Sequence, residues 1–446
     1  MTIDPTALTA AIEALNWIEL KGFKPSYALT NTIRQLNIKE ESVITTAHNL
    51  IQETLKRKNL IEKILTVAIP PSTLQKAKPN VKNFLKIYAY TTKLSPSRQD
   101  AIELVKTGRE ILGWRTLHPV EVYLGRLLTL NLTTLYNGLA DEEKTALETW
   151  HPQWFIHYCY RLLGRTEALK LLQKYAEGIP TYIHPNTLMG PEATIVGRLR
   201  REKIELENTA ELKDLYLALD TSSPLWMTEA HREGLFNIED KGSYLAVSAS
   251  GAKAGMAVLD ISADGMAKTV HLAQLMGNSG RIISAVILPR RPEALEKEIR
   301  KYGVAIAEPI NFDPNKPLPT PIEADIAIVN PPSSRTGLFG TDPATKWKTK
   351  PEDVKNYTPT QMKVLEEGAR HVKTGGTLIY TTPSIALEEN EMVIERFLNL
   401  APGFKLEKVD SCLGSPALRG LPSCVRIYPH LHNSNGGFVA KMRRTS

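Results

Sequence analysis

The stretch AVLDISADGMAKTVHLAQLMGNSGRIISAVI, residues 257–287, decides the fold of the C-terminal half of this chain. Two short β-rich runs, Ala257–Ile261 and Ile282–Ile287, flank a segment at Ala267–Met276 that we expect to be helical. Strands that alternate with helices in this way are typical of a doubly wound parallel sheet. We therefore expect an α/β domain here.

The same alternation continues toward the C-terminus. Further strands are expected at Val304–Ala307, Asp325–Val329, Thr377–Thr381 and Phe438–Met442, and further helices at Pro292–Tyr302, Thr358–His371 and Glu389–Leu398. In such sheets ligands bind beyond the carboxyl ends of the strands. A functional site is therefore expected in the segments that follow Asp260, Val286 and Val329.

The residues before this sheet have a different pattern. Residues 1–150 begin with an Asp4-Pro5 helix start and then place apolar residues at helical spacing, so we expect an all-α domain. Residues 151–235 combine a helix with extended segments, which predicts a small α/β module. Residues 236–446 then form the doubly wound domain.

Composition sets wider bounds. A chain of 446 residues with 42% hydrophobic and 23% charged residues is an ordinary globular protein of two to four domains. The net charge of +7 is compatible with RNA binding.

Cys159, Cys412 and Cys424 form no CxxC pair, so we expect no metal site and no disulfide framework. No apolar run reaches the roughly 20 residues of a membrane helix, and the first residues lack the basic and then apolar pattern of a signal peptide, so we expect no membrane partner and a cytoplasmic location.

One segment connects the sheet to a known family. Val329–Gly337, VNPPSSRTG, closely resembles the catalytic loop D-A-P-C-S-G-T-G of the RsmB/Nop/Sun family of RNA cytosine-5 methyltransferases. Further segments match that family in order, at Lys346-Trp347, Thr374–Ile385, Glu388–Glu391 and Pro429–Arg444. The N-terminal helices resemble, more loosely, the NusB-like RNA-binding domain of some members. The resemblance implies a Rossmann-like class I methyltransferase domain that acts on ribosomal or transfer RNA, preceded by an all-α NusB-like domain.

The reacting positions depart from the family. There, one cysteine thiolate adds to the pyrimidine ring, and a second cysteine takes part in breaking the enzyme–RNA bond. Here Ser333 and Pro383 stand at those positions, and Asn330 replaces the acidic residue of the loop. A serine hydroxyl needs an activating base, and proline offers no nucleophile. We therefore assign no catalytic residue and treat these three positions as degenerate.

The cofactor loop departs as well. Asp260–Thr269 resembles the family's D-L-C-A-A-P-G-G-K-T segment, which binds S-adenosylmethionine. The resemblance assigns cofactor contacts to Asp260, Ala263, Gly265, Asp313, Asn330 and Pro332. The pocket is altered at Asp264, Met266, Ala267 and Val286, where small or acidic residues are expected. We therefore expect cofactor binding that is weak or lost.

Basic residues border the groove in which the family holds its RNA. They are Arg335, Lys346, Lys348 and Lys350, and we expect them to contact phosphates. The favoured interpretation is an RNA-binding protein, with ribosomal or transfer RNA as partner, that lacks cytosine-5 methylation.

Two alternatives remain open. The first is an active S-adenosylmethionine-dependent RNA methyltransferase with altered residues. Asn330-Pro331-Pro332 also resembles the N/D-P-P-Y/F motif of amino-nitrogen methyltransferases, although Ser333 stands where that motif has its aromatic residue. The second is a protein–protein scaffold.

Overall fold

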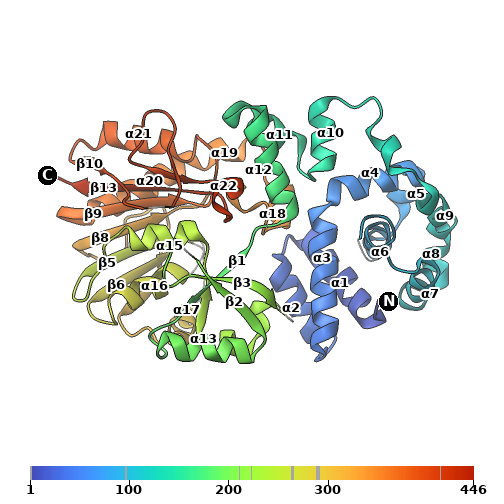
Figure 1. Ribbon diagram of the computed structural model, residues 1–446, viewed down its shortest axis with the longest axis horizontal. Helices are drawn as coiled ribbons and strands as arrows, with labels where there is room; N and C mark the ends of the chain where they lie inside the picture. The colour runs from blue at the N-terminus through green and yellow to red at the C-terminus, as the bar shows by residue number, and fades with distance from the viewer. Residues whose placement is uncertain are drawn as a thin grey trace. The chain divides into compact units, whose positions relative to one another are not determined.

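The computed structural model describes residues 3–95, 98–209, 211–221, 224–262, 266–287, 292–411 and 413–446. The chain divides into two compact units (Figure 1). Residues 1–176 together with Lys346–Lys348 form the first, which we call the helical unit, and residues 177–345 and 349–446 form the second, the sheet unit. Among the described residues, no helix combines the length and apolar character that crossing a membrane requires.

The helical unit begins as the sequence predicts. Asp4 caps the first helix by accepting hydrogen bonds from the backbone N–H groups of Thr6 (2.7 Å) and Ala7 (3.1 Å), and Pro5 is its first residue. The helices of the unit are α1 (Pro5–Lys21), α2 (Pro25–Gln35), α3 (Glu41–Lys56), α4 (Lys58–Ala68), α5 (Pro71–Lys76), α6 (Pro79–Ala89), α7 (Ala101–Leu112), α8 (Trp114–Glu121), α9 (Leu124–Thr129), α10 (Asp141–Glu148), α11 (Gln153–Leu163) and α12 (Arg165–Glu177), with short turns η1 (Tyr90–Leu94) and η2 (Leu132–Tyr136).

The helical unit extends further along the chain than the boundary expected at residue 150. Helices α11 and α12 belong to it, because their aromatic residues Phe155 and Tyr175 are buried against each other and against His151. The Asn59 side chain on α4 reinforces this packing by donating to the carbonyls of Ala146 (2.6 Å) and His151 (3.2 Å).

The sheet unit opens with a small antiparallel sheet, β2-β3-β1-β4. Its elements are β1 (Thr181–Pro185), α13 (Glu192–Arg201), β2 (Ile204–Asn208), β3 (Tyr216–Thr221), η3 (Leu225–Met227), α14 (Glu229–Arg232) and β4 (Phe236–Ile238). Ile183, Leu199 and Phe236 are completely buried in its core. The α/β character expected for this region therefore lies in residues 181–238.

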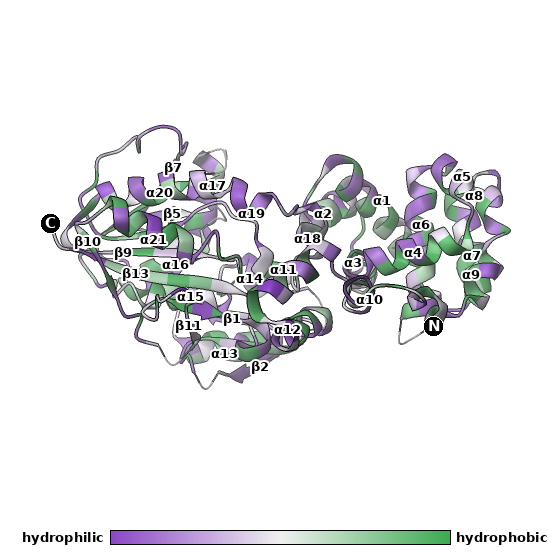
Figure 2. Ribbon diagram, turned by 90° about the horizontal axis from the view of Figure 1, so that it is seen from above, coloured by the Kyte–Doolittle hydropathy of each residue, from purple (hydrophilic) through white to green (hydrophobic). Residues whose placement is uncertain are grey.

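The large sheet has the strand order β11-β12-β13-β9-β8-β5-β6-β7, with β10 paired to β13. The described pairs from β7 to β9 are parallel, and β13 is antiparallel to β9. Its strands are β5 (Ala257–Ser262), β6 (Arg281–Val286), β7 (Ala307–Asn311), β8 (Ala324–Asn330), β9 (Val372–Thr382), β10 (Phe404–Glu407), β11 (Ser415–Pro416), β12 (Val425–Ile427) and β13 (Gly437–Arg444). In Figure 2 much of β9 and β13 is coloured as hydrophobic.

Helices cover both faces of this sheet and enclose two hydrophobic cores. The helices that contribute side chains to these cores are α15 (Lys241–Ser248), α16 (Ala267–Leu275), α17 (Pro292–Lys301), α20 (Thr358–Arg370) and α21 (Glu391–Leu400). The same part of the chain also contains α18 (Pro343–Lys348), whose last three residues group with the helical unit, α19 (Asp353–Asn356), α22 (Pro429–His432) and the short turn η4 (Thr336–Leu338). The expected Rossmann-like α/β class is confirmed. The strand expected at Val304–Ala307 differs in the structure: the Val304 backbone N–H donates to the Ile299 carbonyl of α17, and β7 begins only at Ala307.

Candidate nucleic-acid and cofactor site

A cavity of about 360 Å³ opens at the carboxyl ends of β8 and β9, beside the start of α16. This is the edge of the sheet at which the sequence predicts a ligand. The walls of the cavity are formed by Ile238, Glu239, Asp240, Gly242, Ser243, Ala267, Lys268, Asn330, Arg335, Leu338, Thr341, Asp342, Thr381, Thr382, Pro383, Asn435, Gly436 and Gly437. A volume of this order suits a small organic group such as a nucleobase.

Asn330 and Lys268 meet on one wall of the cavity, and both are at least nine-tenths buried. The Asn330 amide satisfies both of its neighbours when its oxygen accepts from Lys268 Nζ (3.0 Å) and its nitrogen donates to the Thr381 carbonyl (3.3 Å). An amide gives the lysine a hydrogen bond but no counter-charge. The negative charges that act on Lys268 are instead those of Asp240 and Asp260.

Burial raises the pKa of both aspartates, but the two side chains make different contacts. Asp240 lines the cavity and caps α15 by accepting from the Ser243 backbone N–H (2.9 Å). Asp260 accepts hydroxyl hydrogen bonds from Ser262 (2.5 Å) and Thr269 (2.6 Å) and so joins the end of β5 to α16. Asp260 is completely buried, and its hydrogen bonds give it a structural role in this arrangement.

The other expected cofactor contacts and the altered pocket positions lie in different surroundings. Met266 and Val286 are buried in the hydrophobic core, and Val286 offers no polar group at the end of β6. Asp313 is half exposed and accepts from the Asn315 backbone N–H (3.0 Å) within its own turn, which lowers its pKa. Pro332 contributes a carbonyl that accepts from Gln361 Nε2 (3.0 Å). The expected positions Ala263, Asp264 and Gly265 lie outside the described residues.

Beneath the loop that follows β8, a buried carboxylate organises the polar groups. Glu389 accepts from the Ser334 backbone N–H (2.7 Å), the Ser334 hydroxyl (2.5 Å), the Ser384 hydroxyl (2.5 Å) and Gln361 Nε2 (3.0 Å). Burial raises the pKa of Glu389 to about 7, and these hydrogen bonds oppose that rise only in part. The loop after β8 and the loop after β9 therefore both donate hydrogen bonds to the Glu389 carboxylate.

Two neighbours of Glu389 extend this framework. The Asn390 side chain accepts from the Thr382 hydroxyl (2.5 Å) and donates to the Ser384 carbonyl (2.9 Å). Glu391 pairs in a bidentate way with Arg426, through Nε (2.5 Å) and Nη2 (2.6 Å), and both side chains are buried. Arg426 also donates to the Ile385 carbonyl (2.9 Å), so a strand of the large sheet supports the same loop. We call Glu389, Asn390, Glu391, Arg426 and their partners the loop framework.

A close backbone contact at Gly337 holds the loop that contains Gly436 against the loops that follow β8 and β9. Gly337 donates from its backbone to the Pro383 carbonyl (3.1 Å) and accepts from the Gly436 backbone N–H (2.9 Å). A Cβ on Gly337 would lie 2.0 Å from the Gly436 carbonyl oxygen, so this close approach requires glycine.

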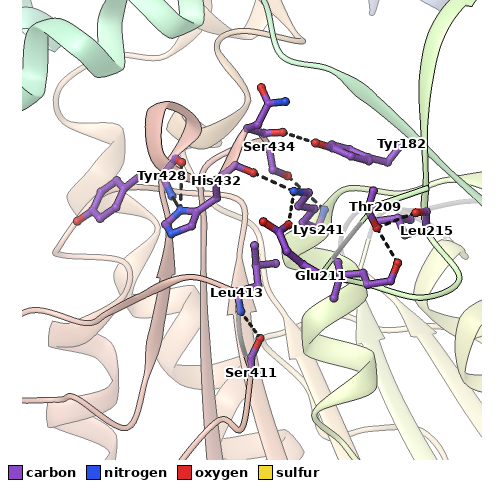
Figure 3. Close-up of polar contacts among 12 residues, drawn as sticks. Tyr182, Thr209, Glu211, Leu215, Lys241, Ser411, Leu413, Tyr428, His432 and Ser434 are labelled. Atoms are coloured by element: carbon purple, nitrogen blue, oxygen red, sulfur yellow. Dashed lines mark hydrogen bonds and ion pairs between the residues drawn. The ribbon is translucent and has the colours of Figure 1, made fainter. Parts of the chain in front are cut away.

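The loop that carries Gly436 is anchored from the small sheet and α15, as Figure 3 shows. Lys241 is buried and donates through Nζ to the Glu211 carboxylate (2.7 Å) and the His432 carbonyl (3.1 Å), while its backbone N–H donates to the Ser434 hydroxyl (3.2 Å). The Tyr182 hydroxyl donates to the Asn433 carbonyl (2.5 Å). One wall of the cavity thus depends on residues outside the catalytic-loop motif.

A buried histidine pair backs another wall. Glu239 places one carboxylate oxygen against His184 Nδ1 (3.0 Å) and the other against His271 Nδ1 (3.2 Å). Burial alone would raise the pKa of Glu239, but the two imidazoles outweigh it and hold that pKa well below the usual range; burial lowers the pKa of His271. Among the described residues these three bring metal-ligating atoms within 4.8 Å of one another. Their mutual hydrogen bonds already account for the contacts.

The degenerate reacting positions contrast with the framework around them. Ser333 is buried, does not line the cavity, and its hydroxyl has no hydrogen-bond partner among the described residues. Pro383 lies in the cavity wall, where its carbonyl accepts from Gly337. No described base is paired with the Ser333 hydroxyl, so the structure provides no means of activating it.

The four expected RNA contacts have different environments. Arg335 adopts a left-handed backbone (φ 58°), lines the cavity and lies 3.8 Å from Asp342, while Lys350 is exposed. Lys346 groups with the helical unit, where it is buried and donates to the Lys56 carbonyl (3.0 Å). Lys348 is exposed and donates to the Gly22 carbonyl (2.8 Å). Lys346 therefore differs from the expectation, because its ammonium group faces protein and not solvent.

Sequence comparisons agree with the catalytic-loop resemblance. Residues 251–443 match the family described as 16S rRNA methyltransferase RsmB/F. Over 97% of its length the chain is 25% identical to the probable ribosomal RNA small subunit methyltransferase B of Bacillus subtilis, 98% of which is covered.

Solved structures share the fold. The structure of PH0851 superposes with a TM-score of 0.85 at 24% identity and is matched over 100% of both chains. The structure of NSun6 from Pyrococcus horikoshii with SFG gives a TM-score of 0.60 at 21% identity, covering 66% of this chain and 98% of that one. The chain is thus similar to ribosomal RNA methyltransferases of the RsmB/F kind, and residues 251–443 carry the match to that family.

Proposed function

We propose that this protein binds ribosomal RNA through its methyltransferase fold and does not methylate carbon 5 of cytosine. One contrast carries this proposal. Residues of the loop framework are hydrogen-bonded or ion-paired, whereas the Ser333 hydroxyl has no partner among the described residues and the Pro383 side chain has no polar atom. Cytosine-5 chemistry in the family needs a thiolate that attacks the ring and a second cysteine that helps to release the product. The chain offers an unactivated hydroxyl and a proline in those roles.

RNA as the partner is supported by the relatives and by charge. The Bacillus subtilis relative is named a ribosomal RNA methyltransferase, and this chain carries a net charge of +7. Lys268 and Arg335 line a cavity whose size suits a single base, and Lys350 is exposed on the segment that follows α18. The cavity lining also holds Glu239, Asp240 and Asp342, so the phosphates of a nucleotide whose base entered it would be contacted by basic residues outside the cavity.

S-adenosylmethionine is the cofactor implied by the family, and the described residues fit it poorly. Asp260 uses both carboxylate oxygens on hydroxyls of the protein, and Val286 has no group that could bind a ribose hydroxyl. Asp313 is engaged in its own turn. We therefore infer that cofactor binding is weak or lost. A calorimetric titration with S-adenosylmethionine tests this point, and a dissociation constant in the low micromolar range would contradict it.

Methyl transfer is tested with labelled S-adenosylmethionine and ribosomal RNA from cells that lack the modification, with a family member that retains both cysteines as positive control. The proposal predicts no label in RNA above the level seen without protein. Label in an exocyclic amino group would instead support the alternative based on Asn330-Pro331-Pro332.

RNA binding itself is tested by titration at several salt concentrations. Affinity should fall steeply with salt, since each phosphate contact releases counterions. Replacing Arg335 and Lys350 by Ala should weaken binding and reduce the salt slope by roughly one unit per lost contact. A wild-type protein without salt-dependent RNA binding would leave a protein–protein scaffold as the function.

A further inference from the structure

Two histidines and a glutamate from separate elements of the sheet unit meet behind one wall of the cavity. His184 lies on β1, Glu239 follows β4, and His271 lies on α16. All three are buried, and a metal-ligating atom from each lies within 4.8 Å of the other two. We call these residues the His–Glu–His cluster. It contains no cysteine, so the spacing of cysteines along the chain gives no indication of it.

The fold itself brings the three side chains together. β1 and β4 are antiparallel, with His184 opposite Asn237, and the Glu239 backbone N–H donates to the Tyr182 carbonyl (3.1 Å). This pairing sets Glu239 beside His184, and α16 brings His271 to the other oxygen of the same carboxylate. The cluster therefore joins the small sheet to a helix that packs on the large one.

The distances within the cluster suit one shared ion. His184 Nδ1 lies 3.0 Å from Glu239 Oε2, and His271 Nδ1 lies 3.2 Å from Glu239 Oε1. Two ligands of a tetrahedral zinc ion, each about 2.0–2.1 Å from the metal, are about 3.3–3.4 Å apart. An ion that took the place of the two bridging protons would therefore leave these nitrogen–oxygen distances almost unchanged.

Packing fixes the orientation of the two imidazoles. Their ring centroids are 4.4 Å apart, with an interplanar angle of 68°. The Tyr244 ring contacts both, at 5.4 Å from His184 and 4.7 Å from His271. Ligands whose orientation is set by neighbouring side chains form a site with little rearrangement.

The charges around the cluster favour a cation. Burial lowers the pKa of His271, which favours the neutral ring that binds a metal. Burial alone would raise the pKa of Glu239, but the two imidazoles hold it well below its usual range, which favours the carboxylate. The negative charge of Asp214 also acts on His271. A divalent ion would offset the charge of a carboxylate that is buried inside the protein.

We propose that the His–Glu–His cluster binds one zinc ion, with His184 and His271 as nitrogen ligands and Glu239 as the carboxylate ligand. Two imidazoles and a carboxylate suit zinc, whereas magnesium and calcium take oxygen ligands. Glu239 also belongs to the lining of the cavity, which is the side from which the ion would enter. The ion would tie the small sheet to α16 behind the cavity wall. This inference goes beyond the proposed function and does not depend on RNA binding.

The test uses the full chain, freed of metal by a chelator, with zinc or cobalt alone as the probe. Zinc should bind at one ion per chain, as measured by calorimetry and by elemental analysis of the dialysed protein. Cobalt should give the visible absorption of a tetrahedral site and should be displaced by zinc but not by magnesium. Zinc at about 100 times its dissociation constant should raise the melting temperature of the sheet unit by about 5–10 °C.

Variants locate the ion. Glu239→Gln keeps the size of the side chain but removes the carboxylate. Zinc affinity should fall by more than about 100-fold, since even the hydrogen-bond partners of metal ligands contribute about 10–100-fold. His184→Gln should have the same effect. The matched control is Glu142→Gln, which removes the carboxylate of the exposed His157–Glu142 pair (3.2 Å) in the helical unit and should leave zinc binding unchanged. Circular dichroism of each metal-free variant verifies its fold.

X-ray absorption at the zinc edge of the wild-type protein tests the site even if both variants fail to fold. The inference predicts nitrogen and oxygen ligands at about 2.0–2.1 Å, with the scattering of two imidazoles. Sulfur ligands at about 2.3 Å would overturn it. So would a protein that does not bind zinc at one ion per chain, or equal affinity in Glu239→Gln and wild type, since hydrogen bonds alone would then hold the cluster. None of these results would affect the proposed function, which RNA binding tests separately.

Discussion

The loop framework and the reacting positions lie within the same few loops but are built differently. The carboxylate oxygens of Glu389 accept hydrogen bonds, and those of Glu391 pair with Arg426. At Ser333 a buried hydroxyl has no partner, and at Pro383 the side chain has no polar atom. The geometry of the loops after β8 and β9 is therefore maintained by interactions that do not involve the side chains of Ser333 and Pro383. A protein that needs the shape of this groove for binding would keep the first set and could lose the second.

The largest expected effect concerns the ion pair of the framework. Arg426→Met leaves the Glu391 carboxylate buried without its partner, which should cost about 3–5 kcal/mol of stability. The calorimetric transition of the sheet unit should shift down accordingly. Arg419→Met is the matched control, because its pair with Glu395 is partly exposed and is worth at most about 1 kcal/mol. Similar shifts for both variants would contradict the distinction between framework and surface.

The second effect is a pH dependence that comes from Glu389. Its folded pKa of about 7 lies above the ordinary value of 4.5, so between these values the folded protein binds more protons than the unfolded chain. Stability from this group is therefore lost as the pH rises from about 4.5 through 7, by roughly 3 kcal/mol at most.

Glu389→Gln removes the titration, so the variant should be less sensitive to pH than the wild type across that window. Denaturant midpoints measured at pH 4.5, 5.5, 6.5 and 7.5 give the difference. Glu388→Gln, at the partly exposed neighbour, should keep the wild-type slope. An unchanged slope in the Glu389 variant would show that the carboxylate is ionised throughout.

A smaller effect is expected at the glycine contact. Gly337→Ala places a methyl group against the Gly436 carbonyl oxygen, and the required shift should cost about 1–3 kcal/mol. The same shift should change the cavity wall and weaken RNA binding. Gly125→Ala, in the helical unit and with open space around its Cβ, is the control and should not lower stability. A Gly337 variant as stable as the wild type would show that the two loops are not held together.

The smallest effect should come from a reacting position. Ser333→Ala removes a buried hydroxyl that has no partner, so stability should change by less than about 0.5 kcal/mol or rise slightly. RNA affinity should not change either, because Ser333 does not line the cavity. A large loss of stability or affinity would reveal a role for this serine that the framework account lacks.

Much of the sheet unit could be predicted from the sequence, because strands and helices alternate regularly there. The expected strand Asp325–Val329 and helix Thr358–His371 correspond to β8 and α20 within one or two residues. The expected strand at Val304–Ala307 lies too early in the chain, because Val304 follows α17 and donates its backbone N–H to the Ile299 carbonyl, a contact that the apolar pattern does not indicate. The loop that follows β8 can be singled out in the sequence because its residues are contiguous.

The rest of the site depends on contacts between distant residues. Glu389 meets Ser334 across 55 positions, and Glu239 meets His184 across another 55, so no local spacing indicates either contact. Lys346 was expected to face RNA because it lies in a basic segment, but charge along the sequence does not say which side chains are buried. The adjacent Trp347 is a large aromatic residue within this basic segment, which is a local indication that the segment packs against protein. In the structure its indole N–H donates to the Leu55 carbonyl (2.6 Å).

Nucleoside mass spectrometry decides whether the protein binds ribosomal RNA in this groove without methylating carbon 5 of cytosine. Unmodified ribosomal RNA is incubated with an equimolar amount of the protein and excess S-adenosylmethionine, and bound RNA is recovered, digested and analysed for 5-methylcytidine. The account predicts that RNA is recovered with the protein and that its 5-methylcytidine stays at the level of a protein-free control. Enzyme-dependent 5-methylcytidine that disappears in Ser333→Ala would contradict it.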